Sequence, residues 1–495
     1  MGKSMAEATN RGDDNLATEL PSNYLPAVEY RDLPDPRGLR KYLGASVILT
    51  ATAMGAWELL FWPEIVSQVG IAVVGLPVLG ITLQFFLNME IERYTLVTGE
   101  TAVTGFSRLW LGWGIVFILA AILPNTLPGY ASVGVWLLTI NFGLSANAVP
   151  TVTTIFLIAI ALSLTLTPMT YQVFEKVQAG FLAVILVFIV LAIFVATDAS
   201  AWAGVVTKAP SGVAKLPQYL KEIGIATLFG AVVFAGAGGC TNLAQSNYIR
   251  DKGMGMGIHI PNIVSPITGK EEAAAPSLGY VPPSTEENTR RFRGWWKVAN
   301  QEHFITFWFT SALLLVSLSV LVFSTVGVKE NVGQGLALLE EEGRILGQRI
   351  APWFEEFFYI AGFAMLFSTT IGVIDYVSRI SGDSLKVTFL KESEFWSESK
   401  LYALVVWMMA IGGSLLLLTG IEPIILVVLS VTGNGFAMAF YSVLLIVLNR
   451  RALPEFARLK GWRVPVMIFC AAFYILFALY LIYQIATQGP SSLVA

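Results

Sequence analysis

Two apolar spans of this sequence are broken at their centres, at corresponding places in the two halves of the chain. Span 1 covers 44–63, and its middle is the small and polar stretch 50–58. Span 6 covers 223–249, and its middle is the glycine-rich stretch 234–242. Backbone that leaves a helix at membrane depth has N–H and C=O groups that lipid cannot satisfy, so it must line a cavity enclosed by protein. Paired breaks of this kind indicate the substrate site of a transporter.

The alternative explanation is a pair of ordinary kinked helices, because glycine is common in membrane spans. Polar residues at the breaks favour the cavity, since Glu58 lies within the first break and Asn242 beside the second. Ionisable and polar groups at membrane depth are retained for function more often than by chance.

Composition places the chain in the membrane. Hydrophobic residues make up 55% of the sequence and charged residues only 13%, whereas a soluble domain carries about 25% charged residues. Both cysteines, Cys240 and Cys470, lie in apolar spans, so neither a disulfide framework nor a cysteine-based zinc site is expected. We therefore predict an all-α integral membrane protein of the cell membrane.

Eleven spans are long enough to cross the bilayer as helices when the broken spans are included. Span 3 is interrupted by Pro124 and Pro128, which predict a kink. The predicted spans are 43–65, 71–92, 112–140, 150–168, 176–197, 223–249, 302–325, 352–378, 401–419, 422–448 and 464–486.

The span order predicts two inverted five-helix repeats followed by one extra helix, because each repeat has an odd number of spans and opens with a broken one. The long loop within the second repeat is either a solvated connector or a regulatory docking segment. The predicted parts are a disordered cytoplasmic tail at 1–42, a first repeat at 43–197, an outer loop at 198–222, a second repeat at 223–448 with a cytoplasmic loop at 250–301, and the eleventh helix at 464–486.

Charge asymmetry sets the predicted orientation, because cytoplasmic loops of membrane proteins are enriched in Lys and Arg. With the N-terminus inside, most basic residues of the long loops fall on the cytoplasmic side. The outer side receives only Lys208, Lys215, Lys221, Lys329, Arg344 and Arg349. We therefore expect the N-terminus in the cytoplasm and, after eleven spans, the C-terminus outside.

Two runs of residues resemble a known family. Span 2 carries Leu83-Gln84-Phe85-Phe86 and then the run 93–99, Arg-Tyr-Thr-Leu-Val-Thr-Gly. Span 10 carries the run 429–435, Leu-Ser-Val-Thr-Gly-Asn-Gly, and ends in 448–451, Leu-Asn-Arg-Arg. These runs resemble the second and tenth helices of the Nramp metal-ion transporters, within the amino acid–polyamine–organocation superfamily. The resemblance implies the LeuT-type fold and transport by alternating access.

The chain departs from that family at the metal ligands. Where Nramp proteins carry Asp-Pro-Gly-Asn in the first break, this chain has Gly-Ala-Trp-Glu at 55–58. Where they carry Met-Pro-His in the sixth helix, it has Phe-Ala-Gly at 234–236, and Val431 replaces a glutamine of the tenth helix. Carboxylates and carbonyls suit Mg²⁺, Ca²⁺ or Mn²⁺, whereas thioethers select softer metals. This divergent, Nramp-related chain is therefore expected to take a hard cation.

Glu58 is the leading candidate for chemistry. A charged residue at the centre of a membrane helix costs roughly 2.5–3.5 kcal/mol even on lenient scales, so it indicates a function by default. The alternative is a glutamate displaced into a water-filled vestibule. We expect Glu58 to contribute both to the substrate site and to a coupling-ion site, and to be the metal ligand.

Span 8 supplies the other coupling-ion candidates. The hydroxyl groups of Thr369 and Thr370, beside Ser368, can bind sodium where helix 8 faces helix 1 in LeuT-type folds; bonding to their own helix carbonyls is the alternative. Asp375 either carries a proton or forms an ordinary helix ion pair with Arg379.

The remaining polar candidates have plain structural alternatives. Cys240 is either a soft ligand or a small packing residue, and Asn242, Gln245 and Asn434 either orient a substrate or bond helices together. The expected substrate-binding set is Met54, Gly55, Trp57, Glu58, Phe234, Ala235, Gly236, Cys240, Asn242 and Asn434.

Several charged residues are expected to lie away from the site. Glu90 and Glu92 are placed at a solvated helix end. His259 falls in the long loop and His303 at the edge of span 7, where neither suits a proton relay at mid-membrane. If protons are coupled, carboxylates must therefore carry them.

The sequence favours a secondary transporter, either of a hard divalent cation or of a small organic solute, driven by H⁺ or Na⁺. Trp57 and Phe234 suit an organic ligand through apolar or cation–π contact. No phosphate-binding Gly-x-x-x-x-Gly-Lys run and no His-Glu-x-x-His signature occur in the sequence. We expect no cofactor, no enzymatic activity, no nucleic-acid partner and a monomer in the lipid bilayer.

The predicted orientation can be tested by cysteine accessibility. A single cysteine introduced at Thr285, in a chain freed of Cys240 and Cys470, is expected to react with an impermeant maleimide only after the cells are opened. Labelling of that cysteine from outside intact cells would overturn the topology.

Overall fold

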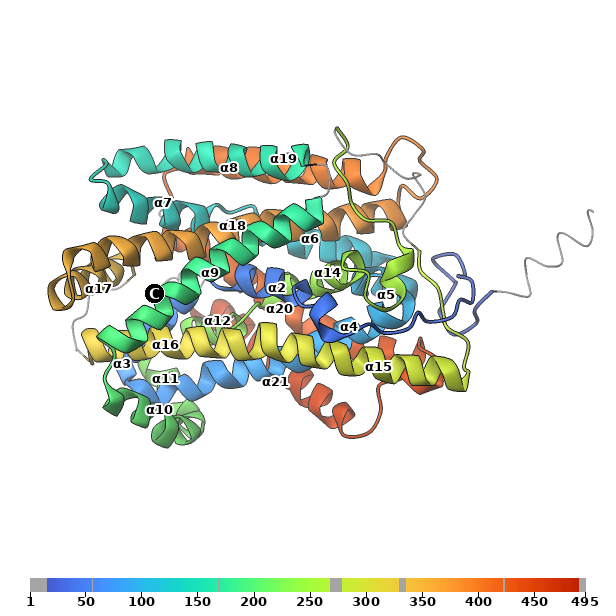
Figure 1. Ribbon diagram of the computed structural model, residues 1–495, viewed down its shortest axis with the longest axis horizontal. Helices are drawn as coiled ribbons and strands as arrows, with labels where there is room; N and C mark the ends of the chain where they lie inside the picture. Colours follow the sequence, from blue (N-terminus) through green and yellow to red (C-terminus); the bar gives the residue numbers. More distant parts are fainter. Residues whose placement is uncertain are drawn as a thin grey trace, which may run out of the picture.

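The computed structural model describes residues 16–55, 57–167, 170–267, 278–328, 335–421 and 423–488. These residues form a bundle of helices, and two isolated β-bridges are the strand pairing recorded among them (Figure 1). The α-helices are α2 Ala45–Ala53, α3 Trp62–Val69, α4 Gly75–Thr98, α5 Ala102–Leu109, α6 Gly112–Asn125, α7 Gly129–Asn141, α8 Val149–Leu166, α9 Thr170–Ala196, α10 Ala199–Gly212, α11 Leu216–Glu222, α12 Ile225–Val233, α13 Gly239–Leu243, α14 Gln245–Asp251, α15 Glu286–His303, α16 Thr310–Thr325, α17 Leu336–Arg349, α18 Pro352–Thr388, α19 Glu398–Leu417, α20 Pro423–Arg451 and α21 Arg463–Gln488.

Two π-helical segments and six short 3₁₀ turns complete the described structure. The π-helical segments are η2 Trp57–Phe61 and η7 Phe304–Phe309. The 3₁₀ turns are η1 Leu39–Lys41, η3 Ile71–Val74, η4 Ala146–Ala148, η5 Val213–Lys215, η6 Gly255–His259 and η8 Glu455–Ala457.

The all-α membrane architecture is confirmed. Eight helical stretches of the described residues are long and apolar enough to cross a bilayer. Three of the eleven predicted spans fall outside that set. The two broken spans are divided into short helices, and span 10, which forms α20, is the third. The number of eleven crossings therefore stays a prediction.

Both predicted breaks are present. In the first, α2 ends at Ala53, Met54 and Gly55 leave the helix, and the chain resumes as the π-helix η2; Ala56 lies outside the described residues. In the second, α12 ends at Val233 and α13 begins at Gly239.

Glycine is required in the second break for conformational reasons. Gly236, Gly238 and Gly239 have φ values of +99°, +70° and +55°, which residues with a Cβ rarely adopt. A Cβ on Gly239 would also lie 2.4 Å from the Cβ of Asn434. The glycine-rich sequence thus fits an unwound backbone rather than a kinked helix.

The longest helix, α18, lies near the centre of the bundle and packs against α2, α6, α7, α9 and α19 (Figure 1). The predicted kink of span 3 is also observed, because α6 ends at Asn125 and α7 begins at Gly129. These two arrangements bring α18 and the α6–α7 bend towards the first break.

The expected loop at 250–301 contains a long helix instead of a connector alone. α15 starts at Glu286 and continues through η7 into α16, so that 286–325 is one helical stretch. Thr285 caps its start by accepting a hydrogen bond from the backbone N–H of Asn288. Within this loop, residues 268–277 lie outside the described part of the chain.

The expectation of a disordered tail at 1–42 is wrong for residues 16–42. Leu20 and Leu33 are buried, and the indole N–H of Trp295 donates to the carbonyl of Pro34 at 2.7 Å. The apolar residues of this segment are spaced irregularly between prolines, so no periodic pattern revealed that α15 covers them. Residues 1–15 lie outside the described part.

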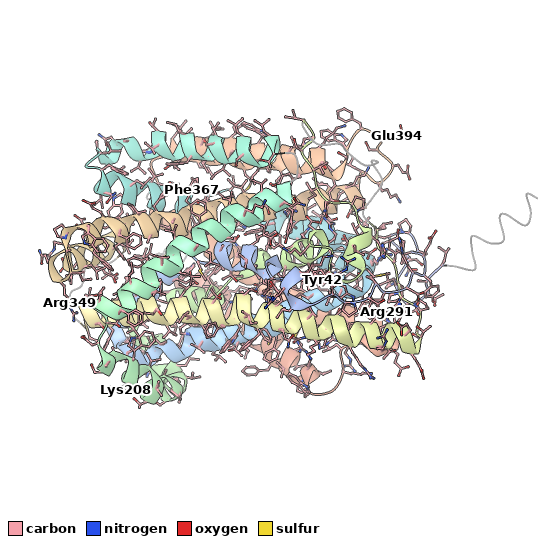
Figure 2. The ribbon with its side chains drawn as sticks, viewed as in Figure 1. Tyr42, Lys208, Arg291, Arg349, Phe367 and Glu394 are labelled. Atoms are coloured by element: carbon pink, nitrogen blue, oxygen red, sulfur yellow. The ribbon has the colours of Figure 1, made fainter. Side chains whose placement is uncertain are left out.

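The two ends of the bundle differ. The N-terminal segment and the start of α15 share one end, whereas α10, α11 and α17 gather at the other (Figure 1). In Figure 2, Arg291 and Glu394 mark the first end, and Lys208 and Arg349 mark the opposite end.

Candidate substrate-binding site between the two broken helices

The carboxylate of Glu58 joins the two breaks. It is 1% exposed. Its Oε2 accepts a hydrogen bond from the backbone N–H of Gly55 at 3.1 Å, and its Oε1 accepts one from the N–H of Gly236 at 3.3 Å. Glu58 therefore satisfies one freed amide of each broken helix. It also lies within the π-helix η2, a geometry that is frequent at functional sites.

Gln84 of α4 forms hydrogen bonds with four backbone groups of the second break. Its Nε2 donates to the carbonyl oxygens of Val233 and Ala235 at 2.7 and 2.8 Å. Its Oε1 accepts from the N–H groups of Ala237 and Gly238 at 2.9 and 2.8 Å. One amide side chain thus replaces four backbone bonds that an unbroken helix would have made.

Asn434 of α20 holds the start of α13. Its Oδ1 accepts from the backbone N–H of Cys240 at 3.2 Å, and its Nδ2 donates to Oδ1 of Asn125 at 2.9 Å. The predicted residue Asn434 therefore lies at the second break. The side chain of Val431, one turn earlier, lies outside the described part of the chain.

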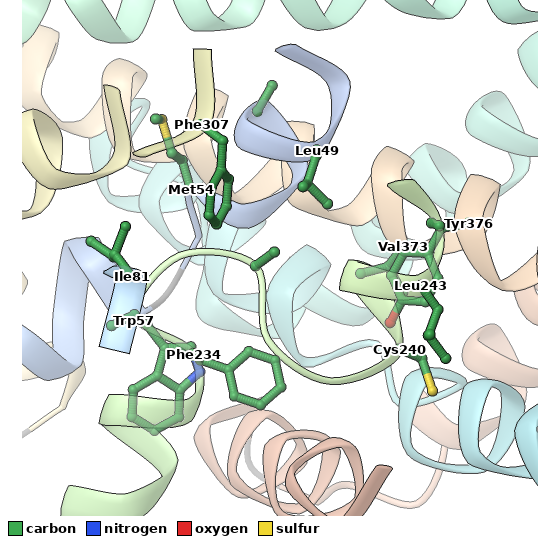
Figure 3. Packing of buried hydrophobic residues seen from close by; sticks show 14 of the residues in the cluster. Leu49, Met54, Trp57, Ile81, Phe234, Cys240, Leu243, Phe307, Val373 and Tyr376 are labelled. Atoms are coloured by element: carbon green, nitrogen blue, oxygen red, sulfur yellow. The ribbon is translucent and has the colours of Figure 1, made fainter. Parts of the chain in front are cut away.

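A small cavity of about 20 Å³ lies between the breaks, large enough for about one water molecule. Figure 3 shows Trp57 and Phe234 side by side below the unwound segment, with ring centroids 6.0 Å apart. The lining residues are Thr52, Ala53, Gly55, Trp57, Asn125, Tyr130, Phe234, Ala237, Thr241, Thr369, Val373 and Tyr376.

The cavity contains some of the expected residues and others that the sequence did not reveal. Gly55, Trp57 and Phe234 form part of its wall. Glu58 does not line the cavity, but its carboxylate bonds to the amide of Gly55, which does. Met54 is buried beside the cavity, and its carbonyl bonds to α18.

Asn125 and Tyr130 were missed because span 3 suggested only a kink. The bend between α6 and α7 points both residues at the breaks, where they line the cavity. The available signal was a polar residue next to a proline in an apolar span, where a bend frees backbone groups and turns side chains inward.

The hydroxyl groups of α18 meet the first break, as a coupling-ion site on helices 1 and 8 would require. Ser368 Oγ donates to the carbonyl of Ala51 at 2.9 Å, and Thr369 Oγ1 donates to that of Met54 at 3.1 Å. Thr370 instead bonds to its own helix, at the carbonyl of Leu366. Thr369 therefore faces the site, whereas the hydroxyl of Thr370 does not.

Asp375 belongs to a buried ion-pair network. It pairs with Arg379 at 2.7 Å and accepts from the hydroxyl of Tyr402 at 2.7 Å. Arg379 also pairs with Asp251 of α14, and Arg250 pairs with Asp383 at 2.9 Å. The network joins α14 to α18.

Two further candidates lie near the second break without lining the cavity. The side chain of Asn242 donates to the hydroxyl of Tyr441 at 3.0 Å. Cys240 is fully buried as a free thiol. Across the described ranges, no group of three or more His, Cys, Asp or Glu side chains is arranged to hold a metal ion.

The expectation that Glu90 and Glu92 lie at a solvated helix end is wrong, because both are fully buried. Glu90 pairs with Arg93 at 2.6 Å and Arg463 at 2.9 Å. His303 is also fully buried, with Nδ1 3.2 Å from Oε1 of Glu92. Helices α15 and α21 pack against α4 and cover a helix end that the hydropathy pattern alone leaves exposed.

No protein-family model matches the sequence, and neither does any curated protein. The structure is similar to a mutant of the Eremococcus coleocola manganese transporter, with a TM-score of 0.66 and 13% identity over 95% of this chain and 92% of that one. It is also similar to Mhp1, a nucleobase-cation-symport-1 family transporter, with a TM-score of 0.51 and 14% identity over 92% and 96% of the two chains. This chain has the LeuT-type fold. The likeness agrees with the resemblance in spans 2 and 10.

A third solved structure, the same manganese transporter in complex with an aromatic bis-isothiourea substituted compound, has a TM-score of 0.61. It shares 14% identity, and the match covers 95% of this chain and 93% of that one. In the LeuT-type fold of the present chain, α2–α3 and α12–α14 are the two broken helices.

Replacing Gln84 by leucine is expected to destabilise the protein by at least about 3 kcal/mol, because four buried backbone groups lose their partner at about 1–3 kcal/mol each. Thermal unfolding of the purified protein in detergent measures the loss. The matched control is Gln68→Leu, on the exposed face of α3. Equal unfolding midpoints for the two variants would show that Gln84 does not hold the second break.

Proposed function

We propose that this protein is a secondary transporter that moves a cation, in particular a hard divalent metal ion, across the cell membrane by alternating access. The observation that carries the proposal is the buried carboxylate of Glu58, shared between the two broken helices. Within the described part of the chain, it is bonded by backbone amides and by no basic side chain. A buried carboxylate without a cationic partner is a ready ligand for a cation.

The similar solved structures support this proposal through their fold. One of them is a manganese transporter. In the present chain, Phe234 takes the position of the thioether that the resemblance implies, so the oxygens of Glu58 and of the unwound backbone are the available ligands. Oxygen ligands favour Mg²⁺, Ca²⁺ or Mn²⁺.

Transport would proceed through movement of the half-helices. A cation that enters between the breaks competes with the amides of Gly55 and Gly236 for the carboxylate oxygens of Glu58. Gly55 belongs both to the cavity wall and to the bonds of Glu58, so cation binding would change the backbone of the first break. The ion pairs of Arg379 with Asp251 and Asp375 would have to rearrange for α14 to open.

A small organic solute is the second candidate. The stacked rings of Trp57 and Phe234, with Tyr130 at the same cavity, offer an aromatic site. The cavity volume of about 20 Å³ favours an ion in this conformation, because organic ligands occupy pockets of about 300–1,000 Å³.

Coupling to Na⁺ or H⁺ is the next part of the proposal. For sodium, the hydroxyl of Thr369 and the carbonyl of Met54 supply oxygens from α18 and the first break. For protons, Glu58 is better placed than Asp375, which is bonded to Arg379. We further propose a monomer with its N-terminus in the cytoplasm, without a cofactor, enzymatic activity or a nucleic-acid partner.

The variant Glu58→Gln is expected to lower cation uptake into proteoliposomes at least about tenfold. The amide keeps the shape of the side chain but loses its charge, and changes at a metal site typically cost about 10–100-fold in metal affinity or activity. Uptake of Mg²⁺ and Mn²⁺ under separate H⁺ and Na⁺ gradients measures the effect. Glu64→Gln, in the first turn of α3, is the matched control. A monodisperse Glu58→Gln protein with undiminished uptake would remove Glu58 from the mechanism.

The ligand set also predicts selectivity. Titration calorimetry with Mg²⁺, Mn²⁺ and Cd²⁺ is expected to show no preference for Cd²⁺, since Phe234 stands where the resemblance implies the thioether ligand. Cys240→Ala is the control, because its thiol is the soft atom nearest the second break. Micromolar Cd²⁺ binding that survives Cys240→Ala would contradict the oxygen-ligand site.

A further inference from the structure

A second polar centre lies at the start of α2, at the opposite end of this helix from the first break. It consists of Ser46, Glu92, Gln245, Glu302 and His303, and we call it the Glu92–His303 cluster. All five side chains are at most 1% exposed. They come from α2, α4, α14 and α15, so the cluster touches the half-helices that lead away from both breaks.

Glu302 is held by the start of α2. Its Oε1 accepts from the backbone N–H groups of Gly44 and Ser46 at 3.2 and 3.0 Å. Its Oε2 accepts a hydrogen bond from the hydroxyl of Ser46 at 2.5 Å. The single proton of the Ser46 hydroxyl is therefore committed to Glu302, and Ser46 Oγ can only accept its further bonds.

The remaining bonds assign the proton on His303. Gln245 Nε2 donates to Ser46 Oγ at 2.8 Å and to Glu92 Oε1 at 2.9 Å. His303 Nδ1 lies 2.8 Å from Ser46 Oγ and 3.2 Å from Glu92 Oε1. Both neighbours are acceptors, so Nδ1 carries a proton in this arrangement.

Three polar atoms of the cluster are left without a partner. Glu92 Oε2, Gln245 Oε1 and His303 Nε2 are buried and make no hydrogen bond within the described residues. Buried polar groups are otherwise almost always bonded. An unbonded carboxylate oxygen and an unbonded imidazole nitrogen in one cluster are the two places where an additional proton can bind.

The surrounding charges leave the cluster negative. Arg463 of α21 attracts Glu92, but its Nε bonds to Glu90 at 2.9 Å, and Glu90 also pairs with Arg93. Tyr171 of α9 interacts electrostatically with Glu302 and carries no positive charge. The ion pair of Lys252 with Glu175 lies beside Gly44 and adds no net charge. Two ionised carboxylates beside a neutral imidazole would be poorly compensated in this buried site.

The side chains of Glu92, Glu302 and His303 are not arranged as a group that could hold a metal ion. The local backbone is unusual as well. The π-helix η7 begins at Phe304, directly after His303, and such segments inside helices occur frequently at functional sites. Thr50 of α2 donates to the η7 carbonyl of Thr306 at 2.7 Å.

The geometry points to a proton-binding site: Glu92, Glu302 and His303 together hold one exchangeable proton that is coupled to movement of α2 and α14. This inference rests on the proposed transport function and names its coupling ion as H⁺. When α2 moves, Glu302 loses the two amides and the hydroxyl that stabilise its charge. The cluster then redistributes or releases its proton, which links the proton to the position of the half-helices.

Two histidines in the whole chain make a direct test possible. In a full-length chain labelled with ¹⁵N-histidine and carrying His259→Gln, the remaining signal belongs to His303. We expect the Nδ1–H form of His303 at high pH and a single titration step as the pH falls. Glu92→Gln is expected to change the proton affinity of His303 at least about tenfold, that is, by one pKa unit. An unchanged affinity, or a neutral Nε2–H form throughout, would overturn the proposal. Glu302→Gln serves the same purpose if Glu92→Gln is not monodisperse.

The second readout is proton movement into proteoliposomes that contain a pH-sensitive dye, driven by a Mg²⁺ gradient. Glu92→Gln and His303→Gln are expected to lower proton movement per Mg²⁺ at least about tenfold. Glu342→Gln, a buried glutamate on α17 far from the cluster, is expected to leave it unchanged. Undiminished proton movement in both cluster variants contradicts the coupling role. If the wild type moves neither Mg²⁺ nor Mn²⁺, the transport function itself is wrong, and the ¹⁵N titration still decides whether the cluster binds a proton.

Discussion

The satisfaction of unwound backbone inside a membrane is the constraint on which the rest of this structure depends. Glu58 bonds one amide of each break, and Gln84 bonds four backbone groups of the second. Because lipid offers no such partners, the two helices can be broken only where these side chains reach them. The positions of α4 and of the π-helix η2 are therefore tied to the breaks, and the cavity lies where the two unwound segments meet.

The sequence predicted the elements that depend only on residues of the same segment. Glycines at 236, 238 and 239 mark a backbone with positive φ, and they predicted the second break. The sequence did not show which side chain would satisfy that break, because Gln84 is 150 residues away and its role depends on packing of α4 against α12. Asn125 was missed for a similar reason, since only the bend between α6 and α7 turns it inward.

Burial of charge was the least predictable property. Glu90, Glu92 and His303 lie near helix ends in the sequence, which ordinarily implies solvent. Their burial comes from segments that are distant from α4 along the chain, α15 and α21, which pack against it. The sequence of these segments does not predict which helix they pack against. The structure consequently has two polar layers, one at the breaks and one at the Glu92–His303 cluster, and α2 passes through both.

The size of the cavity between the breaks has a consequence for ion dehydration. A volume of about 20 Å³ holds roughly one water molecule, whereas Mg²⁺ keeps several waters and dehydrates reluctantly. A cation that occupies this closed conformation would have to surrender most of its hydration shell to carboxylate and carbonyl oxygens. Discrimination among hard cations would then follow how readily each ion exchanges water, so that a larger, faster-exchanging ion could pass sooner than a smaller one that binds more tightly.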